Sequence, residues 1–279
     1  MSSQLFTFLK QYKVIKGSPF THTTMGKPLG SYNIPSDKNS ELHKLVYDSI
    51  FIHNEFLSLT EKPCTPTNIK VDLDFRYDVY NHKQRNWNED LIKKVVGCYN
   101  QCIQKYIEVD TNDLDAFVSY RDQPYRAIGI IKDGVHIIYP DIICDVEVQK
   151  LIRDLFIKNN KDIFNDLGCK NDINDIVDAA IIARNNWLMY GCSKPRLEPY
   201  LLKKIYSHNL EEVELEDPTE LVSLLSTRDK EENYKIRDER KEELNKKPAG
   251  RPIKVPDKNI KVKISVKKDS PFKEENQIE

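Results

Sequence analysis

The sequence predicts an α+β fold, because strand-like and helix-like patterns of hydrophobic residues follow one another along its middle part. Residues 69–75 alternate apolar and polar side chains, as in a half-buried strand. Residues 88–107 and 145–159 instead carry apolar side chains at the spacing of an amphipathic helix. Two further apolar runs, 126–131 and 135–139, flank an Asp-Gly pair, which favours an antiparallel hairpin. Together these patterns predict a mixed fold of helices and strands.

The predicted elements follow in order along the first 210 residues. Residues 1–40 are polar and rich in Gly and Pro, so we expect an irregular N-terminal lead-in that belongs to the domain that follows. Residues 41–58 carry apolar side chains at helical spacing. The remaining predictions are a strand at 69–75, a helix at 88–107, a strand at 115–120, and hairpin strands at 126–131 and 135–139.

Specific residues predict where the hairpin and the next helix begin and end. The turn of the hairpin is expected at residues 132–134, because Asp133-Gly134 stands between the two apolar runs. Pro140 is expected to end the second strand, since proline cannot donate a ladder hydrogen bond. Asp145 is expected to cap a helix that runs to about residue 159.

Beyond about residue 210 the composition changes. Residues 211–279 are mostly charged, and we expect them to form a largely disordered linker or tail. Within this region, residues 246–268 contain many basic residues against one acid, Asp257. Such a basic segment serves either as an arm that holds nucleic acid or as a solvated linker to a further domain.

Composition limits the classes of function. The 279 residues are 39% hydrophobic and 31% charged, with a net charge of -1, so any basic surface for nucleic acid must be local. The six cysteines include no Cys-x-x-Cys pair, which argues against zinc and indicates a reducing, intracellular compartment. Neither a signal peptide nor a membrane-spanning stretch is visible, so no membrane partner is expected.

The strand at 69–75 carries the first candidate site. Its apolar residues face a core, so Asp72 and Asp74 emerge side by side on the opposite face. One interpretation is an ordinary surface strand. However, Asp is a poor strand former, and two aspartates within an apolar strand break a local rule without a structural gain. Two neighbouring carboxylates suit a divalent cation such as Mg²⁺, which needs only one or two carboxylates plus phosphate.

The second candidate site lies on the hairpin. Lys132, Gly134 and His136 point to one face because strand side chains alternate with a period of two. A lone histidine in a strand is often a half-buried structural residue. Here, however, a cation, a backbone N–H without a side chain in front of it and an imidazole stand in one row, which suits a polyphosphate.

The third candidate segment is 178–194. Asp178 is a possible further metal ligand, while Arg184 and Lys194 are candidate phosphate-binding residues. Taken alone, the segment is also typical of an amphipathic strand or helix whose aromatic residues belong to the core. Asp172 and Asp175 compete with Asp178 for a catalytic role.

Together, the three pieces resemble the archaeo-eukaryotic primase (AEP) superfamily, which has an Asp-x-Asp or Asp-x-Glu strand, a small-residue-x-His strand and then a single Asp. More narrowly, the chain is similar to the N-terminal primase domain of primase-helicases of nucleocytoplasmic large DNA viruses, of poxvirus and giant-virus type. The matching segments, over about residues 20–210, are Thr21-His-Thr-Thr-Met-Gly-Lys-Pro-Leu-Gly-Ser-Tyr32, Val71-Asp-Leu-Asp-Phe-Arg76, Gly134-Val-His-Ile-Ile-Tyr-Pro140 and Arg184-Asn-Asn-Trp-Leu-Met-Tyr-Gly191.

The resemblance implies an α/β unit joined to an RRM-like antiparallel sheet, with the active site in the cleft between them. Residues 41–210 would form the catalytic domain. Asp72, Asp74 and Asp178 would hold two Mg²⁺ or Mn²⁺ ions for template-directed nucleotidyl transfer, with His136 as a further catalytic residue. The residues implied to bind the NTP or dNTP are Lys132, Gly134, His136, Arg184 and Lys194.

Two residues of the motif segments raise questions that the resemblance does not answer. Many superfamily members have Ser where this chain has Gly134, so the backbone N–H of Gly134 would have to bind phosphate without help from a hydroxyl. Arg76 lies on the carboxylate face, where it either orients Asp74 or contacts template. The segment from Thr21 to Tyr32 receives no role.

The expected function is therefore a DNA primase or primase-polymerase that uses a single-stranded DNA template in a viral replication site in the host cytoplasm. A Gly-x-x-x-x-Gly-Lys-Ser/Thr phosphate loop does not occur, so the helicase is expected as a C-terminal domain or a separate subunit. Two alternatives stay open: a catalytically weak nucleic-acid-binding or loading domain, and an Asp-x-Asp glycosyltransferase that binds nucleotide-sugars.

Overall fold

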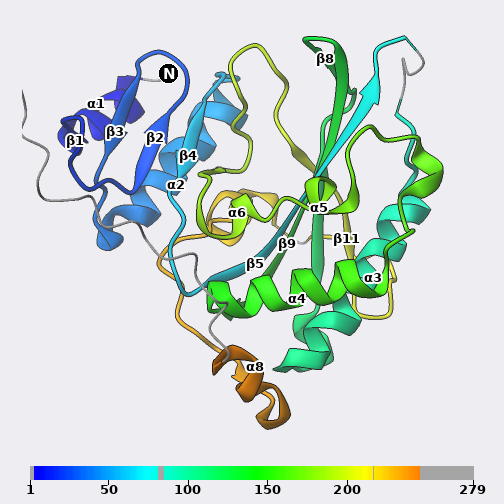
Figure 1. The fold of residues 1–279 in the computed structure, drawn as a ribbon. Helices are drawn as coiled ribbons and strands as arrows, with labels where there is room; N and C mark the ends of the chain where they lie inside the picture. The colour runs from blue at the N-terminus through cyan, green and yellow to red at the C-terminus, as the bar shows by residue number, and fades with distance from the viewer. Residues whose placement is uncertain (1–2, 81–84, 216, 246–279) are drawn as a thin grey trace, which may run out of the picture. The chain divides into compact units, whose positions relative to one another are not determined.

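The computed structural model describes residues 3–80, 85–215 and 217–245 (Figure 1). The described residues up to Leu244 form one compact unit. A second unit, Asn245–Glu279, lies outside the described residues except for Asn245, and so does the predicted basic segment 246–268. Within the described residues, none of the helices combines the length and the apolar character that crossing a bilayer requires.

The N-terminal part forms a five-stranded antiparallel sheet instead of the expected irregular lead-in. Its strand order is β1-β3-β2-β4-β10, and helices α1 and α2 pack against it around Leu9 and Leu42. The strands have only two or three residues each, which is too short for a hydrophobic period to show in the sequence. The elements are α1 (Ser3–Gln11), β1 (Lys13–Val14), β2 (His22–Thr24), β3 (Gly30–Tyr32), α2 (Asn39–Tyr47), β4 (Leu59–Glu61) and β10 (Trp187–Leu188).

The helix expected at 41–58 is confirmed over its first half. Helix α2 continues into a π-helical turn at Asp48–Ile52, and the chain then leaves the helix. Asn54 has a positive φ of 54°, a conformation that Asn tolerates better than most residues and that is common after helix ends. The remaining residues before β4 are irregular.

The central sheet is antiparallel, with strand order β11-β7-β9-β5 and β8 paired to β9. Along the chain its principal elements follow the β-α-β-β-α-β pattern of ferredoxin-like and RRM-like folds. The predicted α+β class is therefore confirmed. The elements are β5 (Thr67–Asp78), α3 (Glu89–Tyr106), β6 (Ile107–Glu108), β7 (Ala116–Tyr120), β8 (Tyr125–Ala127), β9 (Ile130–Cys144), α4 (Val146–Asn159), α5 (Ile173–Ile176), α6 (Ala180–Ala183) and β11 (Leu201–Tyr206).

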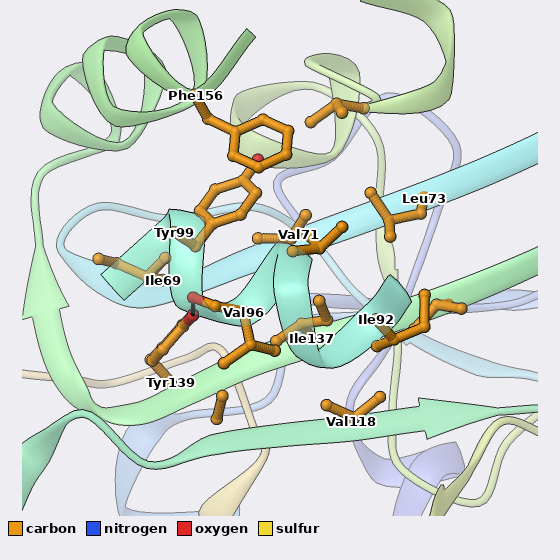
Figure 2. Close-up of a cluster of buried hydrophobic side chains, with 14 of the residues drawn as sticks. Ile69, Val71, Leu73, Ile92, Val96, Tyr99, Val118, Ile137, Tyr139 and Phe156 are labelled. Carbon is orange, nitrogen blue, oxygen red and sulfur yellow. Dashed lines mark hydrogen bonds between the residues drawn. The ribbon is translucent and has the colours of Figure 1, made fainter. Parts of the chain in front are cut away.

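Helices α3 and α4 cover one face of this sheet and enclose the main core (Figure 2). Tyr99 of α3 stacks on Phe156 of α4 with ring centroids 4.3 Å apart. The odd-numbered residues of β5, such as Val71 and Leu73, point into this core, as the alternation predicted. Asp145 caps α4 by accepting a hydrogen bond from the backbone N–H of Glu147, which confirms the predicted start of that helix.

The predicted turn of the hairpin is wrong, because residues 132–134 lie within β9. The chain reverses instead between Ala127 and Ile130, where Gly129 supplies a positive φ of 71°. Asp133 is tolerated inside the strand because its buried carboxylate pairs with Arg85, Nε to Oδ2, at 2.9 Å. Pro140 does not end the strand either: it lies in a bulge, and pairing resumes at Ile143.

The region after residue 210 is more ordered than its composition suggested. Residues 217–245 form short elements that pack on the domain: α7 (Leu221–Leu224), β12 (Lys235–Ile236), which pairs with β6, and α8 (Lys241–Asn245). Leu221 and Leu225 are buried. Buried Glu61 of β4 accepts hydrogen bonds from the Ser226 hydroxyl (2.6 Å) and the Thr227 backbone N–H (2.8 Å), so a few contacts anchor an otherwise charged segment.

We predict that Glu61→Ala lowers the free energy of unfolding by about 3 kcal/mol, because it leaves several buried donors without an acceptor. Burial alone raises the pKa of Glu61, but His22 and the bonds from Ser226 and Thr227 outweigh it and hold the pKa below its ordinary value. Its stabilising effect is therefore complete above the unfolded pKa of about 4.3 and lost as the pH falls through the lower folded pKa.

Urea denaturation measured between neutral and acidic pH checks this prediction. The difference between the wild type and Glu61→Ala should shrink on acidification. Glu41→Ala is the matched control, because the ion pair of Glu41 with Lys38 is exposed and its loss should have little effect. An equally large loss in the control variant would contradict the anchoring role of Glu61.

Candidate active site

The pairing of β5 with β9 brings the first two candidate sites together. Residues directly opposite each other in an antiparallel pair point to the same face of the sheet. The face away from α3 and α4 therefore carries both the acidic row of β5 and the polar row of β9. The register is Asp72↔His136, Asp74↔Gly134 and Arg76↔Lys132.

Asp178 joins this group from a segment a hundred residues further along the chain. Its neighbour Val177 forms an isolated antiparallel bridge with Leu73 of β5. The backbone N–H of Asp178 donates to the carbonyl oxygen of Asp72 at 3.0 Å. The Asp178 carboxylate accepts from the N–H of Ala180 at 2.7 Å, at the start of α6. The third acid is thus fixed beside the β5 edge.

These side chains line one cavity, the central cavity, with a volume of about 440 Å³. One wall is the central sheet, and the opposite wall comes from β2, β4 and β10 of the N-terminal sheet. The cavity therefore lies between the central sheet and the N-terminal sheet. The predicted residues that line the cavity are Asp72, Asp74, Lys132, His136, Asp178 and Lys194.

The acids repel one another in this setting. Burial, followed by the charges of Asp74 and Asp178, raises the pKa of Asp72 to about 7, while Lys194 and Lys132 act in the opposite direction. A raised carboxyl pKa means that the ionised form is disfavoured there. Positive charge supplied to this cavity would restore the ionised form.

Asp74 already has cationic partners. The Nε and a terminal nitrogen of Arg76 both donate to its Oδ2, at 3.0 and 2.8 Å, and Lys132 Nζ lies 3.0 Å from the same oxygen. Of the two roles considered for Arg76, orienting Asp74 is therefore the one that these contacts support. Lys132 balances Asp74 and lines the cavity at the same time.

His136 is held between the two sheets by aromatic rings. Its ring centroid lies 3.7 Å from that of Tyr200 and 4.3 Å from that of Trp187 in β10. Burial, followed by the charges of Arg121 and Lys194, lowers the pKa of His136 well below its ordinary value. The imidazole is therefore neutral at physiological pH, so it can offer a ligand a hydrogen bond but not a positive charge.

The donor set fits Mg²⁺ or Mn²⁺ in chemistry, but the cage is not preformed. Among the described residues, no three His, Cys, Asp or Glu side chains are arranged to hold one ion. Asp74 is turned toward Arg76 and Lys132, and one oxygen of Asp178 caps α6. Mg²⁺ commonly takes only one or two carboxylates and completes its shell with phosphate and water, so the carboxylates fit an ion that arrives with a nucleotide.

Some predicted residues lie elsewhere. Arg184 is exposed at the end of α6 and does not line the central cavity. Asp172 caps α5 by accepting from the N–H groups of Asn174 and Asp175, so it has a structural role. Of the three competing acids, Asp178 alone lines the cavity.

The sequence pattern missed several residues of the cavity wall. Asn186 donates to the hydroxyls of Thr23 and Thr60, at 3.0 and 3.1 Å, which ties the 178–194 segment to β2 and β4. Asn186 and Thr23 lay within quoted motif segments, but no pattern indicated that they meet. Nothing in the sequence pointed to Tyr200. The centre of its ring also lies 3.9 Å from the guanidinium carbon of Arg121.

Tyr200 explains why this strand carries glycine where many superfamily members have serine. A Cβ added at Gly134 would collide with the Tyr200 hydroxyl and lie 3.2 Å from the Leu73 carbonyl oxygen. The tyrosine occupies the space that a serine side chain would need, and it also stacks on His136. A side chain at position 134 would therefore have to displace Tyr200.

Comparisons with known proteins agree with this architecture. Residues 21–206 match the family described as the C962R protein N-terminal AEP domain. The mimivirus (Acanthamoeba polyphaga mimivirus) protein named "Putative helicase L207/L206" is 34% identical over 197 residues, which cover 68% of this chain and 20% of that protein. "Putative helicase 184R" of Invertebrate iridescent virus 6 is 26% identical over 238 residues, 76% of this chain and 24% of its own length. The chain thus spans about a fifth to a quarter of these relatives.

We predict that Gly134→Ala destabilises the domain by about 2 kcal/mol through overpacking against Tyr200. Tyr200→Phe removes the hydroxyl that the new methyl group meets first. The double variant should therefore be more stable than the sum of the two single changes predicts. Thermal or urea denaturation of the four proteins of this cycle measures the coupling, and strictly additive losses would contradict the close-approach explanation.

Proposed function

We propose that this chain, which belongs to the family of the C962R protein N-terminal AEP domain, is a metal-dependent nucleotidyltransferase. In this proposal it makes primers on single-stranded DNA. Membership in this family supports a primase-type role in general terms. The observation that carries the finer proposal is the central cavity, where three aspartates meet two lysines and a neutral histidine.

The residues of the cavity divide into two groups by chemistry. Asp72, Asp74 and Asp178 would hold two divalent cations, which would supply Lewis-acid stabilisation for the reacting phosphoryl group. Lys132 and Lys194 are point charges suited to the β- and γ-phosphates of an incoming NTP or dNTP. In this proposal His136 donates a hydrogen bond to the triphosphate from a neutral ring, whose orientation Tyr200 and Trp187 maintain.

The relatives suggest the setting in which the chain works. Their names read "putative helicase", they belong to a mimivirus and two iridescent viruses, and each is several times longer than the matched segment. We propose that this domain acts beside a helicase, either in one polypeptide or as a partner, so that unwound single strands reach the central cavity. This proposal places it at a viral replication site, in the host cytoplasm.

The two alternatives are a glycosyltransferase and a nucleic-acid-binding loading domain. A glycosyltransferase has no support from the family match. A loading domain that binds nucleic acid without synthesis would also have the fold, and the lack of a preformed three-acid cage among the described residues is the observation that favours it. The same assay of primer synthesis separates it from an active primase.

We predict that Asp72→Asn lowers primer synthesis by about 100-fold or more, since several kcal/mol of charge stabilisation are lost and each 1.4 kcal/mol is tenfold in rate. The fold should survive, because the substitution also removes the repulsion from Asp74 and Asp178. The measurement is incorporation of labelled NTPs and dNTPs into primers on single-stranded DNA, with Mg²⁺ or Mn²⁺. A melting curve of the variant checks that it folds.

Asp166→Asn is the matched control, because Asp166 is exposed in a 3₁₀ turn and does not line the central cavity. It should retain full synthesis. Full activity in Asp72→Asn would remove the metal-site assignment. DNA binding by a wild type that shows no synthesis under any metal condition would favour the loading domain.

A further inference from the structure

A second hollow lies on the N-terminal sheet. This N-terminal groove has a volume of about 820 Å³ and is lined by residues 14–20 and 29–31 together with Thr23, Thr24 and Lys62. Most of these residues lie on strands β1, β3 and β2 and on the loop between β1 and β2, and Figure 1 shows where these strands lie in the fold. Part of its lining comes from the motif segment 21–32, to which the sequence assigns no role.

The N-terminal groove adjoins the central cavity. Thr23 lines both hollows. Its hydroxyl lies 2.8 Å from the hydroxyl of Thr60 and accepts a bond from Asn186, and both of these residues line the central cavity. The two hollows therefore meet at Thr23 of β2.

The charge of the groove has one sign. Among the described residues, its lining includes the exposed Lys16 and Lys62 and no acidic residue. This contrasts with the chain as a whole, whose net charge is -1. The groove is thus a local basic surface of the kind that a polyanion requires from a nearly neutral protein.

The groove also exposes aromatic and aliphatic side chains. Phe20 is partly exposed, and Lys62 Nζ lies 4.7 Å from the centre of its ring. Ile15 is 81% exposed and Leu29 is 65% exposed. A lysine beside an aromatic ring in a basic groove is typical of surfaces that bind single-stranded nucleic acid, where phosphates meet the cations and bases stack on the ring.

We propose that the N-terminal groove binds single-stranded DNA on its way to or from the central cavity, with phosphates at Lys16 and Lys62 and a base against Phe20. This inference rests on the proposed function, since a cavity that copies a template must have a path for the strand beside it. A protein partner would also cover exposed aliphatic side chains. The uniform positive charge and the shared Thr23 favour DNA as the occupant.

Fluorescence anisotropy of a labelled single-stranded oligodeoxynucleotide with the full chain, at several salt concentrations, tests the proposal. Lys16→Ala and Lys62→Ala should each weaken binding and, combined, lower the salt slope by about 1.4, because each contact to a single strand contributes about 0.7. Phe20→Ala should weaken binding by about tenfold with an unchanged salt slope, because it removes stacking and no charge.

Lys94→Ala is the matched control, since Lys94 is an exposed lysine on α3 and does not line either hollow. It should leave affinity and salt slope unchanged. Melting curves verify that all variants fold. Unchanged DNA affinity in the double lysine variant and in Phe20→Ala, or no DNA binding by the wild type, would overturn the proposal, and Ile15 and Leu29 would then indicate a protein-binding face.

DNA binding by the N-terminal groove can be tested separately from synthesis in the central cavity. Asp72→Asn should bind the oligonucleotide as the wild type does while losing synthesis. Groove variants should retain stabilisation by dNTP with Mn²⁺, which reports on the central cavity alone. Loss of DNA binding in the groove variants of a chain that never synthesises would support the groove and reject the catalytic role.

Discussion

The antiparallel register between β5 and β9 is the constraint on which the candidate site depends. It sets Asp72 opposite His136 and Asp74 opposite Gly134, and it is fixed by burial of the alternate residues, such as Val71 and Leu73, beneath α3 and α4. A slip of one residue would place the carboxylates in the core and the aliphatic side chains in solvent. The hydrophobic core and the polar site are therefore two consequences of one pairing, and neither can shift without the other.

Electrostatic balance is the second feature of the site. Burial and the neighbouring acids raise the pKa of Asp72, while Asp74 forms ion pairs with Arg76 and Lys132. These ion pairs turn the Asp74 carboxylate toward Arg76 and Lys132, and in the described part of the chain no three acids, histidines or cysteines are arranged to hold one ion. In the proposed function, nucleotide phosphates would compete for Lys132 just as cations would compete for Asp74.

The N-terminal sheet makes the site a cleft rather than an exposed face. Its edge strand β10 brings Trp187 against His136, and Thr23 of β2 stands at the junction of the central cavity and the N-terminal groove. A segment that looked like a lead-in is thus an integral wall of the site. If both proposals hold, this small sheet separates the place where nucleotides react from the place where the strand passes.

Local periodicity in the sequence was enough to predict the α+β class, the capped start of α4, and the faces of β5 and β9 that carry Asp72, Asp74, Lys132 and His136. The reason is that alternation and capping depend on neighbours along the chain. The turn at Gly129, the choice of Asp178 over Asp172, the exposure of Arg184 and the N-terminal sheet were decided by tertiary structure. Each depends on contacts between distant residues or on strands too short to show a period. Gly134 illustrates both cases. The sequence shows a glycine at this position, but only the tertiary structure shows that Tyr200 occupies the space where a side chain would project.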